Sequence, residues 1–323
     1  MAFARVISAC LLALSVSMHV TQAVAQAFPS KSVTISIATA AGSAPDVIIR
    51  AMAQKMSEAW RQPVVVDNRV SAGGITAVTG VTRAAPDGHV LLVHTAAFTI
   101  APSMYKLPYD TFRDLVPISI IAYLPNVLVV HPGLPVKNVK DLIALAKARA
   151  GELNYASSGS GTPAHLAGEL FKSMAGINIL HVPYKGSPPA LTSTLAGETS
   201  MLFSPVTIVI PHITSGKLRA LGITTAKRSK LVPDMLTIAE SGIPGYEVTQ
   251  WYGMQAPAGT PREVIAKINA EVRNILAMPD IIEKLATQGA EPAPGTPEAM
   301  IAYVKSEVEK WSRVVKTSGA KAD

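Results

Sequence analysis

Short apolar runs alternate along this chain with longer stretches in which apolar residues recur every third or fourth position. Residues 33–37 alternate apolar and polar positions, and residues 90–93 form a continuous apolar run; both patterns are typical of strands. The helical period is clear after the first of these runs, where Ile48, Met52 and Ala59 share one face. Repeated alternation of this kind predicts an α/β fold with mostly parallel sheets flanked by helices.

The alternation occurs twice, over residues 28–125 and 126–246. The extended segment 251–256 has no strand beside it in the sequence, so we expect the chain to return there to its first half. We therefore predict two lobes, one formed by 28–125 with 247–323 and the other by 126–246, joined by crossing strands with a ligand cleft between them.

Small and polar residues follow the strand ends and precede helices at several points. The clearest case is 154–169, NYASSGSGTPAHLAGE, where Thr162 suits a helix N-cap and Pro163 suits the first helical position. Loops of this kind expose backbone N–H groups at the positive end of a helix dipole and favour an anion. Ordinary turns are the alternative. In an open sheet such loops gather where ligands bind, and similar small loops occur at 39–43, 71–74 and 95–97.

The first 27 residues have the pattern of a signal peptide. Arg5 precedes an apolar run at 6–20, and cleavage sites follow at Ala25 and Ala27. Cys10, the only cysteine of the chain, lies within this segment. We therefore expect an exported protein whose mature chain has neither a disulfide nor thiol chemistry.

Charge and motifs exclude several functions. The net charge is +7, but the 29 Lys and Arg residues are scattered and aromatic residues make up only 5%, so we expect no nucleic-acid partner. We find no phosphate-binding loop, dinucleotide fingerprint or zinc signature, and predict neither cofactor nor metal. Gly159-Ser160-Gly161 is not a nucleophile elbow. A secreted hydrolase using Ser160 with His165 or His181 remains an alternative, but we expect no enzyme.

Six short motifs are spread over the whole mature chain: Tyr155-Ala156-Ser157-Ser158-Gly159, His165-Leu166-Ala167-Gly168-Glu169, His181-Val182-Pro183-Tyr184-Lys185-Gly186, Ala84-Ala85-Pro86-Asp87-Gly88, Leu107-Pro108-Tyr109-Asp110 and Trp251-Tyr252-Gly253. In these motifs and their order along the chain, the sequence resembles the Bordetella-uptake-gene (Bug) or TctC-like receptors of tripartite tricarboxylate transporters. The resemblance implies a two-lobed periplasmic binding protein, type II-like, that binds a small organic carboxylate between its lobes. It also implies delivery of the ligand to a membrane permease. A sensor adaptor that passes the signal to a membrane kinase is the alternative, and we expect a monomer.

Two departures from the family pattern bear on the choice of ligand. The first loop, 40–46, keeps Asp46 but lacks most of the glycines usual in the family, and Ser204 stands where relatives often carry Asp or Asn. The loss of a carboxylate at Ser204 disfavours ligands with an amino group and suits dicarboxylic, tricarboxylic or aromatic acids.

The candidate ligand-binding residues are neutral donors at the strand ends, together with side chains that the resemblance places near them. We expect Asp46 to organise its loop, through a capping box with Ser43, since a carboxylate would repel the ligand. For His165 the alternatives are the cleft or a pair with Glu169, and for Tyr184 a cleft wall or the core. The complete set is Ala41, Ser43, Asp46, Gly74, Thr95, Ser158, Ser160, Thr162, His165, Tyr184 and Ser204.

Overall fold

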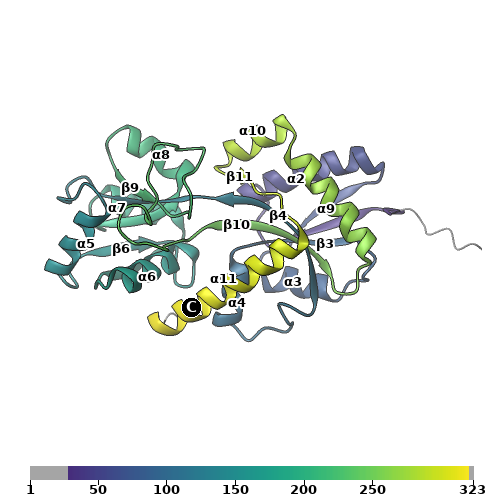
Figure 1. Ribbon diagram of the computed structural model, residues 1–323, viewed down its shortest axis with the longest axis horizontal. Coiled ribbons are helices and arrows are strands. Elements are labelled where there is room, and N and C mark those ends of the chain that lie inside the picture. Colours follow the sequence, from purple (N-terminus) through teal and green to yellow (C-terminus); the bar gives the residue numbers. More distant parts are fainter. Residues whose placement is uncertain (1–27, 320–323) are drawn as a thin grey trace, which may run out of the picture.

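The computed structural model describes residues 28–319 of the chain (Figure 1). The predicted signal peptide, 1–27, and its cleavage sites lie outside the described residues. Two mixed sheets stand side by side, and strands cross between them through the middle of the molecule (Figure 1). No helix in the described part of the chain is long and apolar enough to cross a membrane.

The first sheet has six strands in the order β11-β4-β10-β3-β1-β2. They are β1 (Val33–Ile37), β2 (Val64–Asn68), β3 (Val90–Thr95), β4 (Leu115–Leu124), β10 (Gln250–Pro257) and β11 (Glu291–Pro292). The helices of this half are α2 (Ala44–Trp60), the short η1 (Ala72–Gly74), α3 (Ile75–Thr82), α4 (Ala97–Met104), α9 (Arg262–Leu276) and α10 (Pro279–Thr287). We call this sheet with these helices the first lobe.

The second sheet has five strands in the order β7-β6-β8-β5-β9. They are β5 (Asn126–Val130), β6 (Asn154–Ser157), β7 (Leu180–Pro183), β8 (Met201–Pro205) and β9 (Arg219–Ile223). Its helices are α5 (Val139–Ala148), α6 (Pro163–Ala175), α7 (Ser187–Leu195) and α8 (Val206–Thr214). We call this sheet with these helices the second lobe.

Two connections join the lobes. The chain leaves the first sheet in β4 and enters the second in β5 after a single residue, Pro125, and it returns through β10. The sheets are consequently mixed, where mostly parallel sheets were expected. The pairs β1–β2, β1–β3, β6–β7 and β6–β8 are parallel. Every pairing of β4, β5 or β10 is antiparallel; β4 and β5 lead from the first sheet into the second, and β10 runs back.

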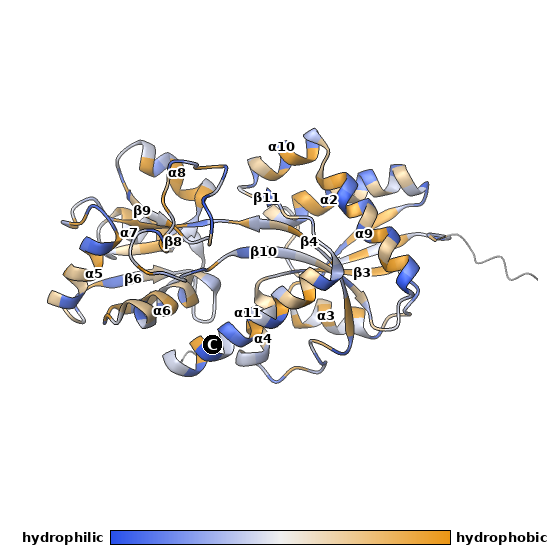
Figure 2. Cartoon of the chain, in the orientation of Figure 1, coloured by the Kyte–Doolittle hydropathy of each residue, from blue (hydrophilic) through white to orange (hydrophobic). Residues whose placement is uncertain are grey.

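Each lobe has its own apolar core, which the strands and the inward faces of the helices form (Figure 2). The last helix, α11 (Pro297–Ser318), contributes to both halves. Near its start Met300 and Val304 pack in the first lobe, whereas Trp311 and Val314 near its end pack in the core of the second. Figure 1 shows this helix running below the crossing strands from one lobe to the other. The helix α11 thus connects the two lobes.

Candidate functional site

A pocket of about 70 Å³ lies at the carboxyl ends of β6 and β8, beside the crossing strands. Its polar wall combines Ser158 after β6, Ser187 at the start of α7 and Ser204 near the end of β8 with Asn126 at the start of β5 and Gln250 at the start of β10. Ala164, Ala190, Leu202, Phe203 and two prolines supply the rest, so all eleven lining residues are neutral: Asn126, Ser158, Pro163, Ala164, Ser187, Ala190, Leu202, Phe203, Ser204, Pro205 and Gln250.

The loop after β6 is folded by its own hydrogen bonds. Gly159 and Gly161 take φ values of 131° and 73°, which favour glycine. Thr162 is the N-cap of α6, as predicted: its hydroxyl accepts from the N–H of His165 and donates to the carbonyl of Gly159 at 2.7 Å. Ser158 is held as well, because its carbonyl accepts from the N–H of Gly186 at 3.3 Å. These hydrogen bonds therefore position the N-terminus of α6 at the pocket.

Helix N-termini give the pocket a positive character without a charged side chain. Ala164 and Ser187 stand in the first turns of α6 and α7, where backbone N–H groups have no acceptor within the helix. Pro205 is the N-cap of α8. The hydroxyls of Ser158, Ser187 and Ser204 add donors beside them. Hydrogen bonds from such groups to a carboxylate are about twice as strong as neutral ones.

Asn126 is the unusual member of the pocket. The residue is only 1% exposed, and its Oδ1 has no hydrogen-bond partner among the described residues. Its N–H donates to Thr224 Oγ1 at 3.3 Å, which fixes the backbone at the crossing point. A buried polar atom without a partner costs about 1–3 kcal/mol. The carboxamide donates through Nδ2 and accepts through Oδ1. A bound group that donates a hydrogen bond would therefore satisfy Oδ1.

The histidine of the predicted loop lies inside the second lobe. His165 is 6% exposed, its Nδ1 accepts from the N–H of Gly161 at 3.0 Å, and its ring stacks on His181 at 3.9 Å between centroids. Glu169 is also buried and accepts from Tyr155 Oη at 2.7 Å and from Lys172 Nζ at 2.9 Å. The expected polar helix face is therefore a buried network that supports the loop from behind.

A serine and a histidine do meet in this network, but not the pair considered for a hydrolase. His181 Nε2 lies 2.6 Å from Ser157 Oγ, and Ser157 is completely buried. A nucleophile has to reach its substrate, so Ser157 is placed as a support for the loop. Ser160, the residue of that hypothesis, lies in the adjoining loop.

The predicted residues of the first lobe organise loops and do not line the pocket. Asp46 accepts from the N–H of Gly42 at 2.8 Å, from Arg50 Nε at 3.0 Å and from Asn68 Nδ2 at 2.9 Å. Burial alone would raise the pKa of Asp46, but these hydrogen bonds outweigh it and hold the pKa below 3.8. Asp46 thus connects its loop with α2 and β2.

The proposed capping box does not form, because Asp46 accepts from the N–H of Gly42 and not from that of Ser43. Ser43 is the N-cap of α2, yet its hydroxyl donates to the carbonyl of Ala40 at 2.6 Å and makes no cap hydrogen bond. Its neighbour Ala41 lies in the exposed turn before it. The remaining candidates lie at helix starts: Gly74 is the N-cap of α3, and Thr95 accepts from the N–H of Ala97 at the start of α4.

The predicted loop of the second lobe contacts α4, the helix that begins at the predicted first-lobe loop 95–97. A β-carbon at Gly161 would lie 2.9 Å from Met104 Cε, so the loop after β6 packs directly on the end of α4. Ile100 of α4 likewise packs in the core of the second lobe. In this arrangement the lobes touch, and the pocket has room for a headgroup and not for a long ligand.

Tyr184 contributes to the core of the second lobe, which was one of its two expected places. Its hydroxyl donates to Ser193 Oγ at 2.6 Å, and its ring packs against the cluster that includes Ala190 and Leu202. Of the predicted residues, the pocket therefore unites Ser158 and Ser204. Ser187 could have been found from the Ser-Pro-Pro start of its helix, whereas Asn126 and Gln250 required knowledge of where the strands cross.

No group of three or more His, Cys, Asp or Glu that could hold a metal ion occurs among residues 28–319.

Comparison with known proteins places the chain in a family. Residues 48–320 match the family model described as "Tripartite tricarboxylate transporter family receptor". The "UPF0065 protein in tcbD-tcbE intergenic region" of Pseudomonas sp. (strain P51) is 39% identical over 96% of this chain and 93% of its own length.

Two solved structures are similar over nearly their full length. "R. palustris Rpa4515 with adipate" is 36% identical, with a TM-score of 0.75 over 91% of this chain and 99% of that one. "MatC (Rpa3494) from Rhodopseudomonas palustris with bound malate" is 30% identical, with a TM-score of 0.71 over 89% of this chain and 100% of that one. The chain therefore belongs to the tripartite tricarboxylate transporter receptor family, whose members are periplasmic solute-binding proteins.

Proposed function

We propose that this protein is a periplasmic receptor that binds a small organic carboxylate and delivers it to the membrane permease of a tripartite tricarboxylate transporter. The observation that carries the proposal is the pocket itself. Three serine hydroxyls and two helix N-termini converge there with no charged side chain on the wall. Such a site stabilises a carboxylate by hydrogen bonds and dipoles alone.

The ligands of two relatives support this class of compound. One was solved with adipate and the other with malate, so both carry dicarboxylates. The pocket of about 70 Å³ suits one headgroup. The rest of the ligand would extend toward the loops of the first lobe, where Ser43, Gly74 and Thr95 lie at helix starts.

In the proposed cycle the two lobes close around the ligand. The signal peptide directs the chain to the periplasm and is removed near Ala25 or Ala27. A monomer then closes on its ligand, and the permease recognises the closed form. Closure is driven by the difference in ligand affinity between the open and closed states. No step requires a cofactor, a metal or catalysis.

A thermal-shift screen tests the proposal on mature, ligand-stripped protein. Mono-, di-, tri- and aromatic carboxylates are compared with amines of matched size. A ligand at a hundred times its dissociation constant stabilises by about 2.7 kcal/mol, which is a shift of several degrees for a domain pair of this size. We expect stabilisation by at least one carboxylate and by no amine. Stabilisation by none of the carboxylates would contradict the proposal.

Variants locate the binding site and separate it from hydrolysis. Ser158→Ala with Ser204→Ala should weaken every carboxylate that binds, whereas the control Ser306→Ala, on the exposed face of α11, should not. A hydrolase would turn over esters and lose that activity in Ser160→Ala; we expect no turnover. Pull-down with candidate permease and sensor-kinase domains distinguishes transport from sensing.

A further inference from the structure

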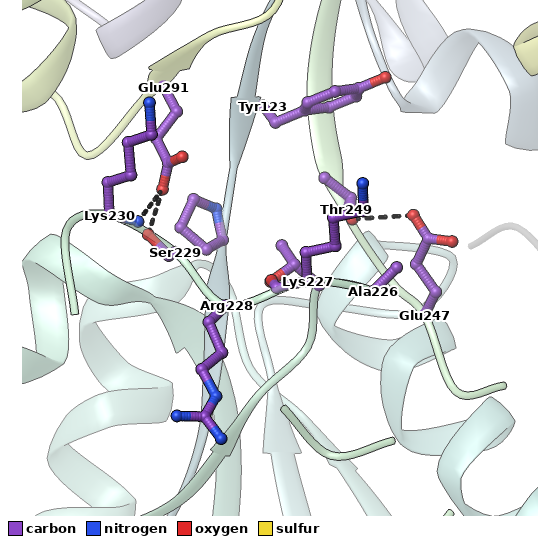
Figure 3. A pocket seen from close by; sticks show the side chains of 11 residues that line it. Tyr123, Ala226, Lys227, Arg228, Ser229, Lys230, Glu247, Thr249 and Glu291 are labelled. Atoms are coloured by element: carbon purple, nitrogen blue, oxygen red, sulfur yellow. Dashed lines mark hydrogen bonds between the residues drawn. The ribbon is translucent and has the colours of Figure 1, made fainter. Parts of the chain in front are cut away.

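A short segment of the first lobe reaches across to the second. In this segment, Gly289 to Glu291, the Glu291 carboxylate accepts from the hydroxyl of Ser229 and, at 3.1 Å, from the N–H of Lys230. Figure 3 shows Lys230 and Ser229 beside Glu291, with Tyr123 above the same cavity. Ser229 is 4% exposed, whereas Glu291 is half-buried and Lys230 is exposed, so this contact between the lobes is partly shielded from water.

A second contact of the same segment is steric. Gly289 has a φ of 70°, and a β-carbon there would lie 2.6 Å from Thr207 Cγ2 and 2.9 Å from Thr207 Oγ1. The side chain of Thr207 therefore packs directly against the backbone of Gly289. Between these two contacts, Ala290 is 1% exposed and packs in the core of the first lobe, which anchors the segment on its own side.

These contacts lie on the face of the crossing strands opposite the candidate pocket. Successive residues of an extended strand point to opposite faces. Asn126 and Gln250 line the candidate pocket, whereas their neighbours Pro125 and Thr249 line the cavity of about 440 Å³ next to Glu291. On one face of the crossing strands the loop that contains Gly161 packs on α4 and joins the lobes. On the other face residues 289–291 join them.

We propose that residues 289–291 form a clasp with Thr207, Ser229 and Lys230, behind the crossing strands, that opposes closure of the lobes over the pocket and thereby sets the affinity for the ligand. Only the effect on ligand affinity rests on the proposed carboxylate-binding function; the contact between the lobes does not. The clasp and the pocket share an element, since Ser204 and Pro205 line the pocket and Thr207 follows them in the first turn of α8. Apparent affinity falls in proportion to the fraction of molecules that are closed.

The test measures the distance between lobes without any ligand. The mature chain has no cysteine, so Lys217→Cys and Lys284→Cys introduce one exposed label site on each lobe, for spin labels and distance measurement by double electron–electron resonance. In the labelled protein we expect one narrow distance distribution. Gly289→Ala should broaden it and lengthen its mean, because the added methyl group forces Thr207 away.

Two controls separate the clasp from general backbone strain. Gly216→Ala carries the same kind of penalty, since Gly216 has a φ of 71°, but nothing lies within 4 Å of a β-carbon there. It should leave the distribution unchanged. Thr207→Ala removes both close atoms and should restore the narrow distribution to Gly289→Ala. Glu291→Gln, a mild change that keeps the fold, should broaden it by weakening the hydrogen bonds.

Ligand binding is read separately with adipate as the probe. Because the clasp lies opposite the pocket, its separation favours the closed state; we expect Gly289→Ala to tighten adipate binding by up to about tenfold if one wild-type molecule in ten is closed, and saturating adipate to lengthen the same distance in the wild type. An unchanged distribution in both Gly289→Ala and Glu291→Gln, or no rescue by Thr207→Ala, overturns the clasp. Adipate and every other carboxylate failing to bind the wild type would overturn the proposed function, while the ligand-free distances would still decide on the clasp.

Discussion

His94 should make folding stability depend on pH between neutral and about pH 4. The residue ends β3 next to Thr95, is 2% exposed, and stacks on Phe98 at 4.2 Å between centroids. Its Nε2 has no hydrogen-bond partner among the described residues. Burial lowers the pKa of His94 from 6.5 to about 4, although Thr95 and Gln255 partly oppose the change.

The sign and size of the effect follow from proton linkage. Below pH 6.5 the unfolded chain binds a proton at this histidine that the folded protein does not bind until about pH 4. The folded state therefore keeps its full stability above pH 6.5 and loses it as the pH falls from 6.5 to about 4. One pKa unit corresponds to about 1.4 kcal/mol, so the total loss is about 3 kcal/mol.

The variant His94→Phe isolates this contribution. Phenylalanine keeps a ring between Phe98 and Trp251 but has no proton to bind. Urea unfolding of both proteins at pH 8, 7, 6, 5 and 4.5 gives the difference in free energy of unfolding at each pH. We expect the free energy of unfolding of the variant to rise steadily relative to that of the wild type below pH 6.5, by about 2–3 kcal/mol at pH 4.5.

Val78→Ala is the matched control, because it thins the same apolar cluster without removing a titratable group. Its difference from the wild type should be independent of pH. A difference between wild type and His94→Phe that is equally flat would refute the reasoning, since it would show that His94 takes up its proton at the same pH in both states.

Three further predictions concern packing, the pocket and the first loop. Gly168→Ala places a β-carbon 2.2 Å from the buried ring of Tyr155 and should lower the free energy of unfolding by about 1–3 kcal/mol. In the control Gly80→Ala the nearest contact is the tip of a flexible arginine, so this variant should be neutral or more stable by up to about 1 kcal/mol. Equal melting temperatures of the two variants would contradict this. Asn126→Asp puts a carboxylate in the pocket and should weaken carboxylate binding at least about tenfold at pH 7.5, with recovery at pH 5 because burial raises an aspartate pKa; calorimetry at both pH values decides. Asp46→Asn should flatten the loss of stability below pH 3.8, since Asp46 has a lowered pKa and its contribution disappears only there; urea unfolding at pH 4 and 3 shows whether the slope persists.

The fold was predictable from the sequence wherever a local pattern decided it. Alternation defined β1, a continuous apolar run defined β3, and the Thr-Pro pair marked the start of α6. The mixed direction of the sheets was not predictable in this way. It follows from where β4 and β10 pass between the lobes, and strand pairing over more than a hundred residues leaves no local signal.

The site was predictable to the same degree. Ser158 and Ser204 lie in the pocket because each directly follows or ends a strand of the second sheet. His165 was ambiguous, since one helical turn cannot show which face the rest of the fold will cover. Asn126 was missed for the opposite reason: a polar residue before an apolar strand is ordinary, and only the tertiary structure leaves its carboxamide buried with an unpartnered oxygen.

The central claim is that the neutral pocket of the second lobe binds the carboxylate of the ligand. Isothermal titration of mature, ligand-stripped protein with the carboxylate that gives the largest thermal shift tests it most directly, with wild type, Ser306→Ala and the double variant Ser158→Ala/Ser204→Ala side by side. Hydrogen bonds to charged groups contribute about 1.5–3 kcal/mol each. The account predicts one site per chain, unchanged affinity in Ser306→Ala, and a loss of at least about tenfold in the double variant. Equal affinity in the double variant and the wild type would contradict it.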